Sequence, residues 1–456
     1  MTTGLRDLAT IRTNVSGRVI GPEDPGYDAE RQVTMGGVDA HPAAIVKVAD
    51  TGDVVAVIDL ARSTGLELAV RCGGHSSAAH STTEGGIVLD VRDLNSLDID
   101  VAGRTAWVGA GLTAGEITTA LASHGLAIGF GDTGSVGVSG ITLGGGIGFL
   151  VRKHGMTIDN LLAAEIVTGT GEVLIADAET NPDLFWAIRG GGGNLGVATR
   201  FRFRLAEVGQ IVGGLLVQPA TAASITTLIR AATDAPEALS LIANVMPCPP
   251  LPFVDEAHHG ELVIFSLVCW SGPVDEADAA LAPIRAAVPP IADLLRPMTY
   301  PEMYGPEDPD YHPLAVGRNL FMDGVDEADA QTMVDRLAAL DAPMKVVQLR
   351  PLGGAMARVA PEATAFAHRR RAIMANVAAF YTGPDDLERT TAWVEGLTRE
   401  LRDGEGAYVN FVADEGPAGI RAAYPPPTYG RLAEVKRRYD PDNVFRRNQN
   451  VEPAPA

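Results

Sequence analysis

The sequence predicts an α+β protein built from two units and a C-terminal segment. Three observations support this. The 456 residues are enough for two or three domains, glycine clusters gather between residues 73 and 196, and from about residue 207 helical and strand patterns alternate. We therefore expect a first unit over residues 1–206 and a second over 207–406, with an antiparallel sheet flanked by helices. Residues 407–456 are again rich in aromatic residues and asparagine, and we expect this segment to rejoin the first unit.

The first unit opens with a strand–helix–strand pattern. Residues 43–48 are predicted to form a strand, an apolar stripe predicts a helix over 53–63, and residues 66–71 are predicted to form the next strand. Thr51 is the expected helix cap, and Gly65 the expected end of the helix. Such a unit favours a right-handed crossover between parallel strands.

Further elements of the first unit follow the same reasoning. A hairpin is expected where a glycine-bearing turn joins residues 163–168 to 172–175, and residues 197–205 alternate arginine with apolar residues as in a half-buried strand. The remaining elements expected in this unit are strands at 86–91 and 105–109 and a helix at 114–124 that ends at Gly125.

The second unit is predicted to be a sheet with helices on one face, because long amphipathic segments separate its strand-like runs. The expected helices are 222–232, 274–287, 326–340 and 384–402. The expected strands are 239–246, 261–270, 315–322, 345–350 and 371–380.

Composition and charge exclude several classes of function. The formal net charge is −21, from 36 basic and 57 acidic residues, and a field of that sign repels nucleic acid and anionic lipid surfaces. There is no apolar run of membrane-spanning length, and Met1–Leu8 lacks a secretory pattern, so a cytoplasmic protein is expected. Three scattered cysteines predict neither a disulfide framework nor a metal site. We expect a monomer or a homodimer.

Glycine-rich loops predict where a ligand binds. Arg71 ends a predicted strand and runs directly into Cys72-Gly73-Gly74-His75-Ser76-Ser77. Small residues after a strand let successive N–H groups point into one concavity, which suits a pyrophosphate. The alternatives are a tight turn for the glycines and a structural role for His75.

Two more glycine loops and the C-terminal stretch complete the pattern. The loops are Gly131-Asp-Thr-Gly-Ser-Val-Gly-Val-Ser-Gly-Ile-Thr-Leu-Gly-Gly-Gly-Ile-Gly148 and Asp183-Leu-Phe-Trp-Ala-Ile-Arg-Gly-Gly-Gly-Gly-Asn-Leu-Gly-Val197. The C-terminal stretch holds Tyr408-Val-Asn410-Phe and residues 429–450, which end in Asn448-Gln-Asn450. Over most of residues 40–206 and 407–452 the chain closely resembles the berberine-bridge-enzyme-like branch of the flavin-linked oxidases with a vanillyl-alcohol-oxidase type of FAD domain.

The resemblance implies an FAD cofactor bonded covalently to His75 through the 8α-methyl carbon. Thr133 occupies the position at which many relatives form a second link through cysteine, so a single link is expected. An azolyl substituent raises the flavin potential and eases hydride acceptance. The residues expected to contact the cofactor are Arg71, Cys72, Gly73, Gly74, His75, Ser76, Ser77, Thr133, Gly134, Ser135, Gly137, Val138, Gly140, Gly144, Gly145, Gly148, Val197, Tyr408, Asn410 and Asn448.

The resemblance also implies an oxidase that transfers a hydride from an alcohol, an amine or an activated C–H group of a small organic substrate, such as a sugar or natural product, with O2 as the electron acceptor. Tyr408 is the expected catalytic phenol, Asn410 the residue that orients it, and His368 a proton relay or a structural residue. Some relatives supply a carboxylate base from the substrate sheet. The strand 345–350 presents Gln348 and Arg350 but no acid.

Two other interpretations stay open at this stage. Residues 107–115 place glycines between a strand and a helix, which is a weak signal for a nicotinamide-dependent dehydrogenase. The chain could also be a non-catalytic binding protein that keeps the flavin scaffold.

Overall fold

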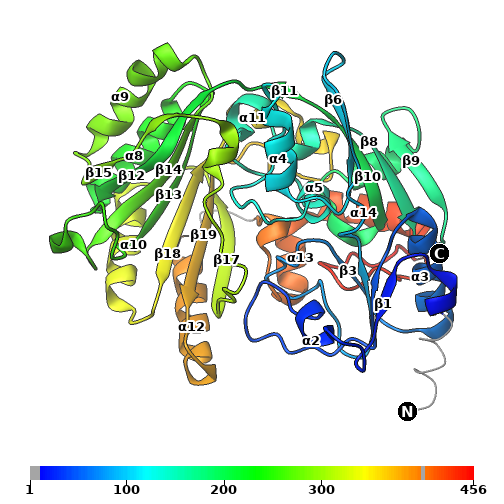
Figure 1. Ribbon diagram of the computed structural model, residues 1–456. Helices are drawn as coiled ribbons and strands as arrows, with labels where there is room; N and C mark the ends of the chain where they lie inside the picture. Colours follow the sequence, from blue (N-terminus) through cyan, green and yellow to red (C-terminus); the bar gives the residue numbers. More distant parts are fainter. Residues whose placement is uncertain (1–10, 402–405, 456) are drawn as a thin grey trace.

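The computed structural model describes residues 11–401 and 406–455, and in it two α+β parts stand side by side (Figure 1). The right-hand part in Figure 1 holds a four-stranded sheet, a five-stranded sheet and a short two-stranded one, and the left-hand part holds one large sheet. The α+β prediction is therefore confirmed. The start of the chain, on which the expectation of no secretory signal depends, lies outside the described residues.

The first sheet forms around the predicted strand–helix–strand unit. Its order is β1 (Arg18–Ile20), β2 (Ala44–Lys47), β4 (Ile87–Asp90) and β3 (Leu68–Arg71). The strands β2 and β3 both pair parallel with β4, which inserts between them, and helix α3 (Thr51–Thr64) connects them. The predicted cap at Thr51 is wrong. The side chain of Asp50 caps α3 by accepting a hydrogen bond from the Asp53 N–H, while the Thr51 hydroxyl donates to Glu165.

The second sheet is antiparallel throughout. Its order is β5 (Leu97–Asp100), β6 (Thr105–Gly109), β10 (Gly196–Arg204), β8 (Leu161–Thr168) and β9 (Val173–Asp177). The predicted hairpin is present as β8 and β9, and the alternating arginines of β10 are exposed while its phenylalanines are buried. The remaining elements of this region are α2 (Tyr27–Glu30), α4 (Ala114–Ala122), β7 (Leu126–Ala127), α5 (Val138–Gly144), α6 (Val151–His154), η1 (Thr157–Asp159), α7 (Pro182–Ala187), η2 (Gly192–Asn194) and β11 (Ala206–Glu207).

The large sheet contains eight strands in the order β15-β12-β14-β13-β18-β19-β17, with β16 beside β12. These strands are β12 (Ile211–Pro219), β13 (Leu239–Pro247), β14 (Leu262–Trp270), β15 (Ala292–Asp293), β16 (Arg296–Met298), β17 (Ala315–Met322), β18 (Lys345–Pro351) and β19 (Ile373–Phe380). Every pair in it is antiparallel, as predicted. Strand β12 was not predicted, because Gly213 and Gly214 interrupt its apolar run.

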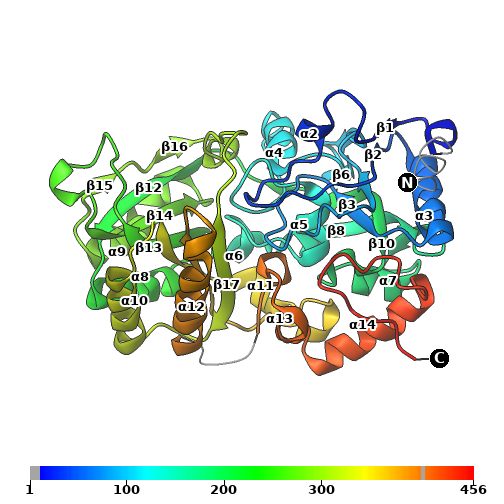
Figure 2. The ribbon, with the colours of Figure 1, turned by 90° about the horizontal axis from the view of Figure 1, so that it is seen from below.

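Four long helices pack on one face of this sheet, as Figure 2 shows from below. They are α8 (Ala222–Asp234), α9 (Ala277–Ala287), α10 (Glu327–Ala339) and α12 (Pro384–Glu400). The predicted end of α12 at residue 402 lies outside the described residues. Shorter elements are η3 (Glu256–His258), η4 (Val274–Glu276), η5 (Tyr300–Met303), α11 (Gly354–Arg358) and η6 (Pro361–Ala363). No helix in residues 11–401 or 406–455 is long and apolar enough to cross a membrane.

The C-terminal elements pack against the N-terminal part of the chain. These are η7 (Val409–Phe411), α13 (Gly416–Ala423) and α14 (Pro426–Tyr439), and Figure 2 shows α14 beside α7. One cluster of buried apolar side chains joins residues from 11 to 205 with residues from 407 to 451. Lys436, fully buried, donates hydrogen bonds to the carbonyls of Asn194 and Phe445. On this basis we propose that residues 1–206 and 407–456 form one domain.

The two parts are joined by a buried arginine. Arg152 in α6 donates hydrogen bonds to the backbone carbonyls of Ala232, Thr233, Ala235 and Leu239, which follow or end helix α8 and begin β13. The carbonyls of Ala232, Thr233 and Ala235 lie at the helix end, where carbonyl groups lack partners within the helix. The arginine therefore fixes the face of the large sheet relative to the glycine-rich loops.

Candidate functional site

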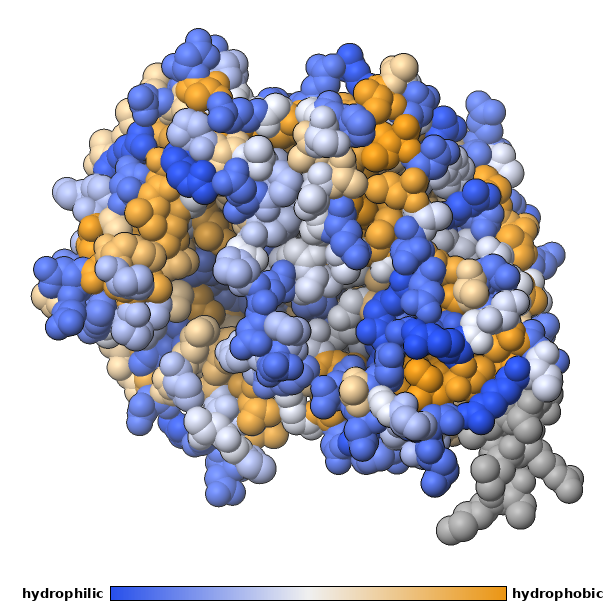
Figure 3. All heavy atoms as spheres, in the orientation of Figure 1, coloured by the Kyte–Doolittle hydropathy of each residue, from blue (hydrophilic) through white to orange (hydrophobic). Residues whose placement is uncertain are grey.

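A cavity of about 690 Å³ lies where the two parts meet. Its walls come from the loop after β3, the loop before α5, the region around η2, strands β17, β18 and β19, and residues 408–413 and 445–449. Figure 3 shows the face of Figure 1, on which a pale band of intermediate hydropathy separates the two halves. The cavity extends from the first sheet to the second unit, because Leu68 and Val70 of β3 line it together with residues of the large sheet.

The loop after β3 forms one wall of the cavity through backbone and small side chains. Cys72, Gly73, Gly74, His75, Ser76 and Ser77 all line it. Gly73 lies against the loop before α5, where a Cβ on it would stand 2.5 Å from the Gly137 amide nitrogen. Arg71 does not reach the cavity, because its buried guanidinium donates to Asp90 at 2.8 and 3.0 Å. It anchors the strand that carries the loop.

His75 is held between the two loops. Its Nε2 lies 2.9 Å from the Ser135 hydroxyl, and the Ser135 amide donates to Glu307 at 2.9 Å. The Ser135 hydroxyl also contacts the Glu307 carboxylate. Burial lowers the pKa of His75, and the negative charge of Glu307 opposes that shift. The imidazole is therefore neutral at pH 7.

The second glycine loop places some of its residues on the cavity and others behind it. Thr133, Gly137 and Gly140 line the cavity, whereas the predicted contacts Gly134, Ser135, Val138, Gly144, Gly145 and Gly148 do not. Three of these six, at positions 144, 145 and 148, are glycine because other groups pack on them. A Cβ would collide with Asn410 at Gly144, with Met156 at Gly145 and with the carbonyls of Phe130 and Gly131 at Gly148.

Replacing Gly137 with alanine is expected to reduce the amount of the FAD predicted from the sequence that the purified protein retains. The new Cβ would stand 2.3 Å from Cys72 Sγ and 2.5 Å from the Gly73 nitrogen, so the two loops must separate. Strain of about 1–3 kcal/mol corresponds to roughly 10–100-fold weaker binding. The measurement is the ratio of flavin to protein absorbance. Gly430→Ala in α14 is the control, because nothing lies within 4 Å of its Cβ position. Full flavin content in Gly137→Ala would contradict the expectation.

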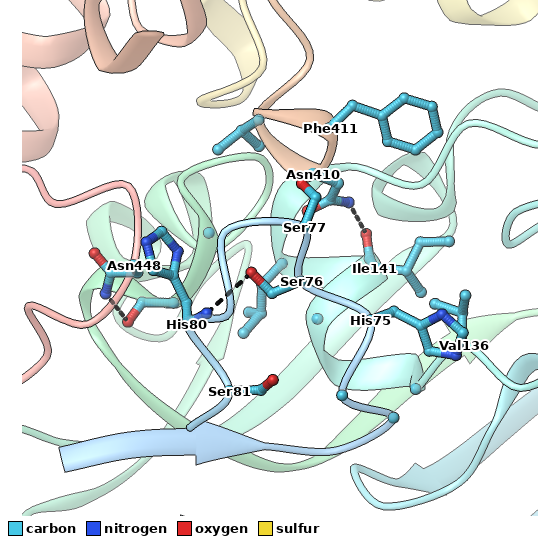
Figure 4. Close-up of a pocket in the computed structure, with 18 of the residues that line it drawn as sticks. His75, Ser76, Ser77, His80, Ser81, Val136, Ile141, Asn410, Phe411 and Asn448 are labelled. Atoms are coloured by element: carbon cyan, nitrogen blue, oxygen red, sulfur yellow. Dashed lines mark hydrogen bonds between the residues drawn. The ribbon is translucent and has the colours of Figure 1, made fainter. Parts of the chain in front are cut away.

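Tyr408 and Asn410 lie together at the start of η7. The Tyr408 phenol oxygen accepts hydrogen bonds from the Gly146 N–H and from Asn410 Nδ2, each at 2.8 Å. Asn410 also donates to the Ile141 carbonyl at 3.1 Å, and Figure 4 shows it beside Phe411. Burial raises the pKa of Tyr408 to about 12, against the opposing effect of these hydrogen bonds and of Arg350. The phenol is therefore protonated at neutral pH.

His368 is not brought to the cavity. It lies 8% exposed with Nε2 3.1 Å from the Ala423 carbonyl, and its ring stacks on Phe321. It lines a separate hollow that also contains Arg370 and Arg421. A proton relay to Tyr408 would need a path that this placement does not provide.

The second unit presents polar side chains to the cavity from alternate positions of its strands. On β18, Val347 and Leu349 point into the helix-covered core, whereas Gln348 and Arg350 line the cavity. Arg350 donates to Asp132 at 2.6 Å and to Gln348 at 2.8 Å. Asp132 is a carboxylate on the cavity wall that the sequence reasoning missed. Asp132 could have been found from the sequence, because it is the one acidic residue in the second glycine loop, residues 131–148.

The far end of the cavity is lined by His80, Ser81, Val197 and Asn448, three of which Figure 4 labels. Asn448 donates to the carbonyls of Gly193 and Phe445. Its Oδ1 and the Ser81 hydroxyl are buried and have no hydrogen-bond partner within the described part of the chain. Burial lowers the pKa of His80 to about 4. Unpartnered buried polar atoms on a cavity wall indicate a ligand with polar groups.

Known proteins share this arrangement. Residues 42–177 match the family described as FAD binding domain, and residues 407–452 match the one described as berberine and berberine like. The chain is 31% identical to (R)-6-hydroxynicotine oxidase of Paenarthrobacter nicotinovorans, over 96% of this chain and 97% of that one. It is also 31% identical to an uncharacterised FAD-linked oxidoreductase of Bacillus subtilis, over 97% and 99%. The chain belongs to the berberine-bridge-enzyme-like FAD-linked oxidases.

Solved structures agree with this assignment. The crystal structure of 6-hydroxy-D-nicotine oxidase from Arthrobacter nicotinovorans superposes with a TM-score of 0.85 at 30% identity, covering 96% of this chain and 98% of that one. The moss protein Physcomitrella patens BBE-like 1 gives a TM-score of 0.88 at 23% identity over the whole of both chains, which shows a shared fold. This FAD-linked oxidoreductase therefore has the two-part architecture of its family.

The residues of this oxidoreductase fit FAD. The glycines at 140 and 193 line the cavity and have nothing within 4 Å of their Cβ positions, so a ligand can approach the backbone there, and the unpartnered Ser81 and Asn448 atoms offer contacts at the far end. Val197 lines the same end. FAD bound here would supply the redox-active group, and the polar side chains at 132, 348, 350, 408 and 410 line the same cavity.

Proposed function

We propose that this oxidoreductase is an oxidase that carries FAD bonded covalently to His75. It transfers a hydride from an alcohol, an amine or an activated C–H group of a small organic substrate, and O2 takes up the electrons. The observation that carries the proposal is the place of His75, on the wall of the cavity and between two glycine loops. Thr133 stands on the second loop where a second link would need cysteine, so one link is proposed.

Tyr408 and Asn410 are proposed to act on the substrate rather than on the fold alone. With two N–H groups already donating to the Tyr408 oxygen, its single O–H is left to donate to a substrate oxygen or nitrogen. A protonated phenol holds the substrate and is not the resting base. Asp132, paired with Arg350, is the carboxylate proposed to take the substrate proton. His368 is left out of the proposed catalytic set.

The substrate region favours a neutral polar molecule. Its two arginines are both paired, Arg350 with Asp132 and Arg318 with Glu395 at 2.9 Å. Gln348 and Asn376 add amide groups, and Val316, Ala378, Phe380 and Phe411 add apolar surface. The name of the relative (R)-6-hydroxynicotine oxidase places a cyclic amine, bound as its neutral free base, among the first substrates to test.

The nicotinamide alternative finds no support in the geometry of residues 107–115. A Cβ on Gly109 would stand 2.2 Å from the Leu94 carbonyl oxygen, and one on Gly111 2.1 Å from that of Val91. These glycines pack against backbone and do not line the cavity. A monomeric or homodimeric state and a cytoplasmic location stay predictions of the sequence.

The wild-type protein tests the proposal directly. We expect a yellow protein whose colour stays in the acid-precipitated pellet, and an intact mass increased by FAD less two hydrogen atoms. Alcohols, cyclic amines and sugars are then screened for flavin bleaching without oxygen and for peroxide in air. An unmodified mass would overturn the covalent link. Bleaching without peroxide formation in air would identify a dehydrogenase, and no bleaching with any compound class would favour a non-catalytic flavin protein.

A further inference from the structure

A chain of three side chains connects the proposed attachment residue to the second unit. His75 lies in the loop after β3, Ser135 in the loop before α5, and Glu307 between η5 and β17. His75 Nε2 lies 2.9 Å from the Ser135 hydroxyl, and that hydroxyl contacts Glu307. The Ser135 amide donates to the other carboxylate oxygen at 2.9 Å, so both oxygens of Glu307 are engaged by one residue.

The direction of these hydrogen bonds follows from their chemistry. An ionised carboxylate only accepts, so the Ser135 hydroxyl must donate its proton to Glu307. That hydroxyl can then only accept from the imidazole. His75 therefore carries its proton on Nε2, and its lone pair stands on Nδ1.

We propose that Glu307 and Ser135 act as positioning residues for the covalent attachment of FAD to His75. They hold the tautomer whose Nδ1 is the nucleophile, and they take the Nε2 proton as the new bond forms. The inference rests on the proposed covalent link and adds the residues that make His75 reactive. Glu307 is exposed, so the proton that it receives passes on to solvent.

The reaction balances with dioxygen as the oxidant. A bond forms between the imidazole nitrogen and the 8α carbon, while one C–H bond of the methyl group and the imidazole N–H bond break. The two electrons and two protons released convert O2 to hydrogen peroxide. A base near the imidazole speeds this step because the ring would otherwise become cationic beside a partly buried cavity wall.

Glu307→Gln and Ser135→Ala test the relay in holoprotein purified in air. The acid-stable fraction of the bound flavin is measured by precipitation and by intact mass, and total flavin by absorbance before precipitation. We expect the acid-stable fraction to fall roughly tenfold or more in both variants, with total bound flavin unchanged. Ser135→Thr keeps the hydroxyl and is expected to restore attachment, which a merely structural role of Ser135 would not predict.

Asp310→Asn is the matched control, because it removes the same charge from the same exposed segment, three residues away. It is expected to attach flavin like the wild type. If the wild type is acid-stable and Glu307→Gln is equally so, the relay is overturned while the covalent link stands. If the wild type itself releases all its flavin in acid, the covalent link fails, and the relay fails with it.

Discussion

Replacing His75 with alanine is expected to leave every bound flavin extractable by acid. In the native protein the imidazole stands on the cavity wall between two glycine loops, so its removal deletes the attachment atom without disturbing the cradle. Loss of the electron-withdrawing link also lowers the flavin potential, and turnover should slow on the order of tenfold, equivalent to about 1.4 kcal/mol in the barrier. Acid precipitation, intact mass and steady-state rates measure the three effects.

The control for this experiment is His80→Ala. His80 lines the same cavity but lies at the opposite end, near Asn448 (Figure 4). The flavin of the His80→Ala variant is expected to stay in the acid-precipitated pellet. If the His75→Ala variant keeps acid-stable colour, His75 is not the attachment site. The same conclusion follows if acid-stable colour is lost only in the His80→Ala variant.

Replacing Tyr408 with phenylalanine is expected to lower kcat by roughly 10²–10³-fold while the flavin content stays the same. The phenol oxygen accepts hydrogen bonds from the Gly146 amide and Asn410, so its O–H is the group proposed to donate to the substrate. Burial raises the pKa of Tyr408 to about 12. The phenol therefore stays protonated between pH 6 and 9, and its removal should lower the rate equally across that range without moving an inflection.

The variant also loses stability, which needs its own control. The Gly146 amide and Asn410 lose their acceptor, at about 1–3 kcal/mol in the free energy of unfolding. Tyr439→Phe removes a hydrogen bond of 2.9 Å to Asp183 outside the cavity. This variant therefore measures how much stability the loss of one tyrosine hydrogen bond costs when no residue of the cavity changes. A kcat for Tyr408→Phe as high as that of Tyr439→Phe would reduce Tyr408 to a structural residue.

Local patterns predicted much of the fold because they determine local structure. The apolar stripe of α3 and the alternation of arginine with phenylalanine in β10 each lie within a single element, and both elements were predicted. Strand β12 was missed, because two glycines conceal its pattern. The cap of α3 was assigned one residue late, because Asp50 and Thr51 are both good caps and only the chain path separates them.

The site could be predicted in part for the same reason. His75, Tyr408 and Asn410 stand in short motifs, and they line the cavity. Asp132 and Glu307 depend on partners 218 and 172 residues away in the chain, at Arg350 and Ser135. No local spacing encodes such pairs. His368, predicted as a proton relay or a structural residue, lies outside the cavity because its ring is packed on Phe321 and its Nε2 faces the Ala423 carbonyl.

The joining of both chain ends in one buried core has a consequence for biosynthesis. A ribosome makes His75 early, but Tyr408 and Asn448 come last, and the core that supports the cavity includes residues up to 451. At 5–20 residues per second this delay is roughly 20–75 seconds. The nascent polypeptide therefore cannot complete the core around the cofactor before residue 451 has been made, and a chain that stops before Tyr408 is expected to be colourless.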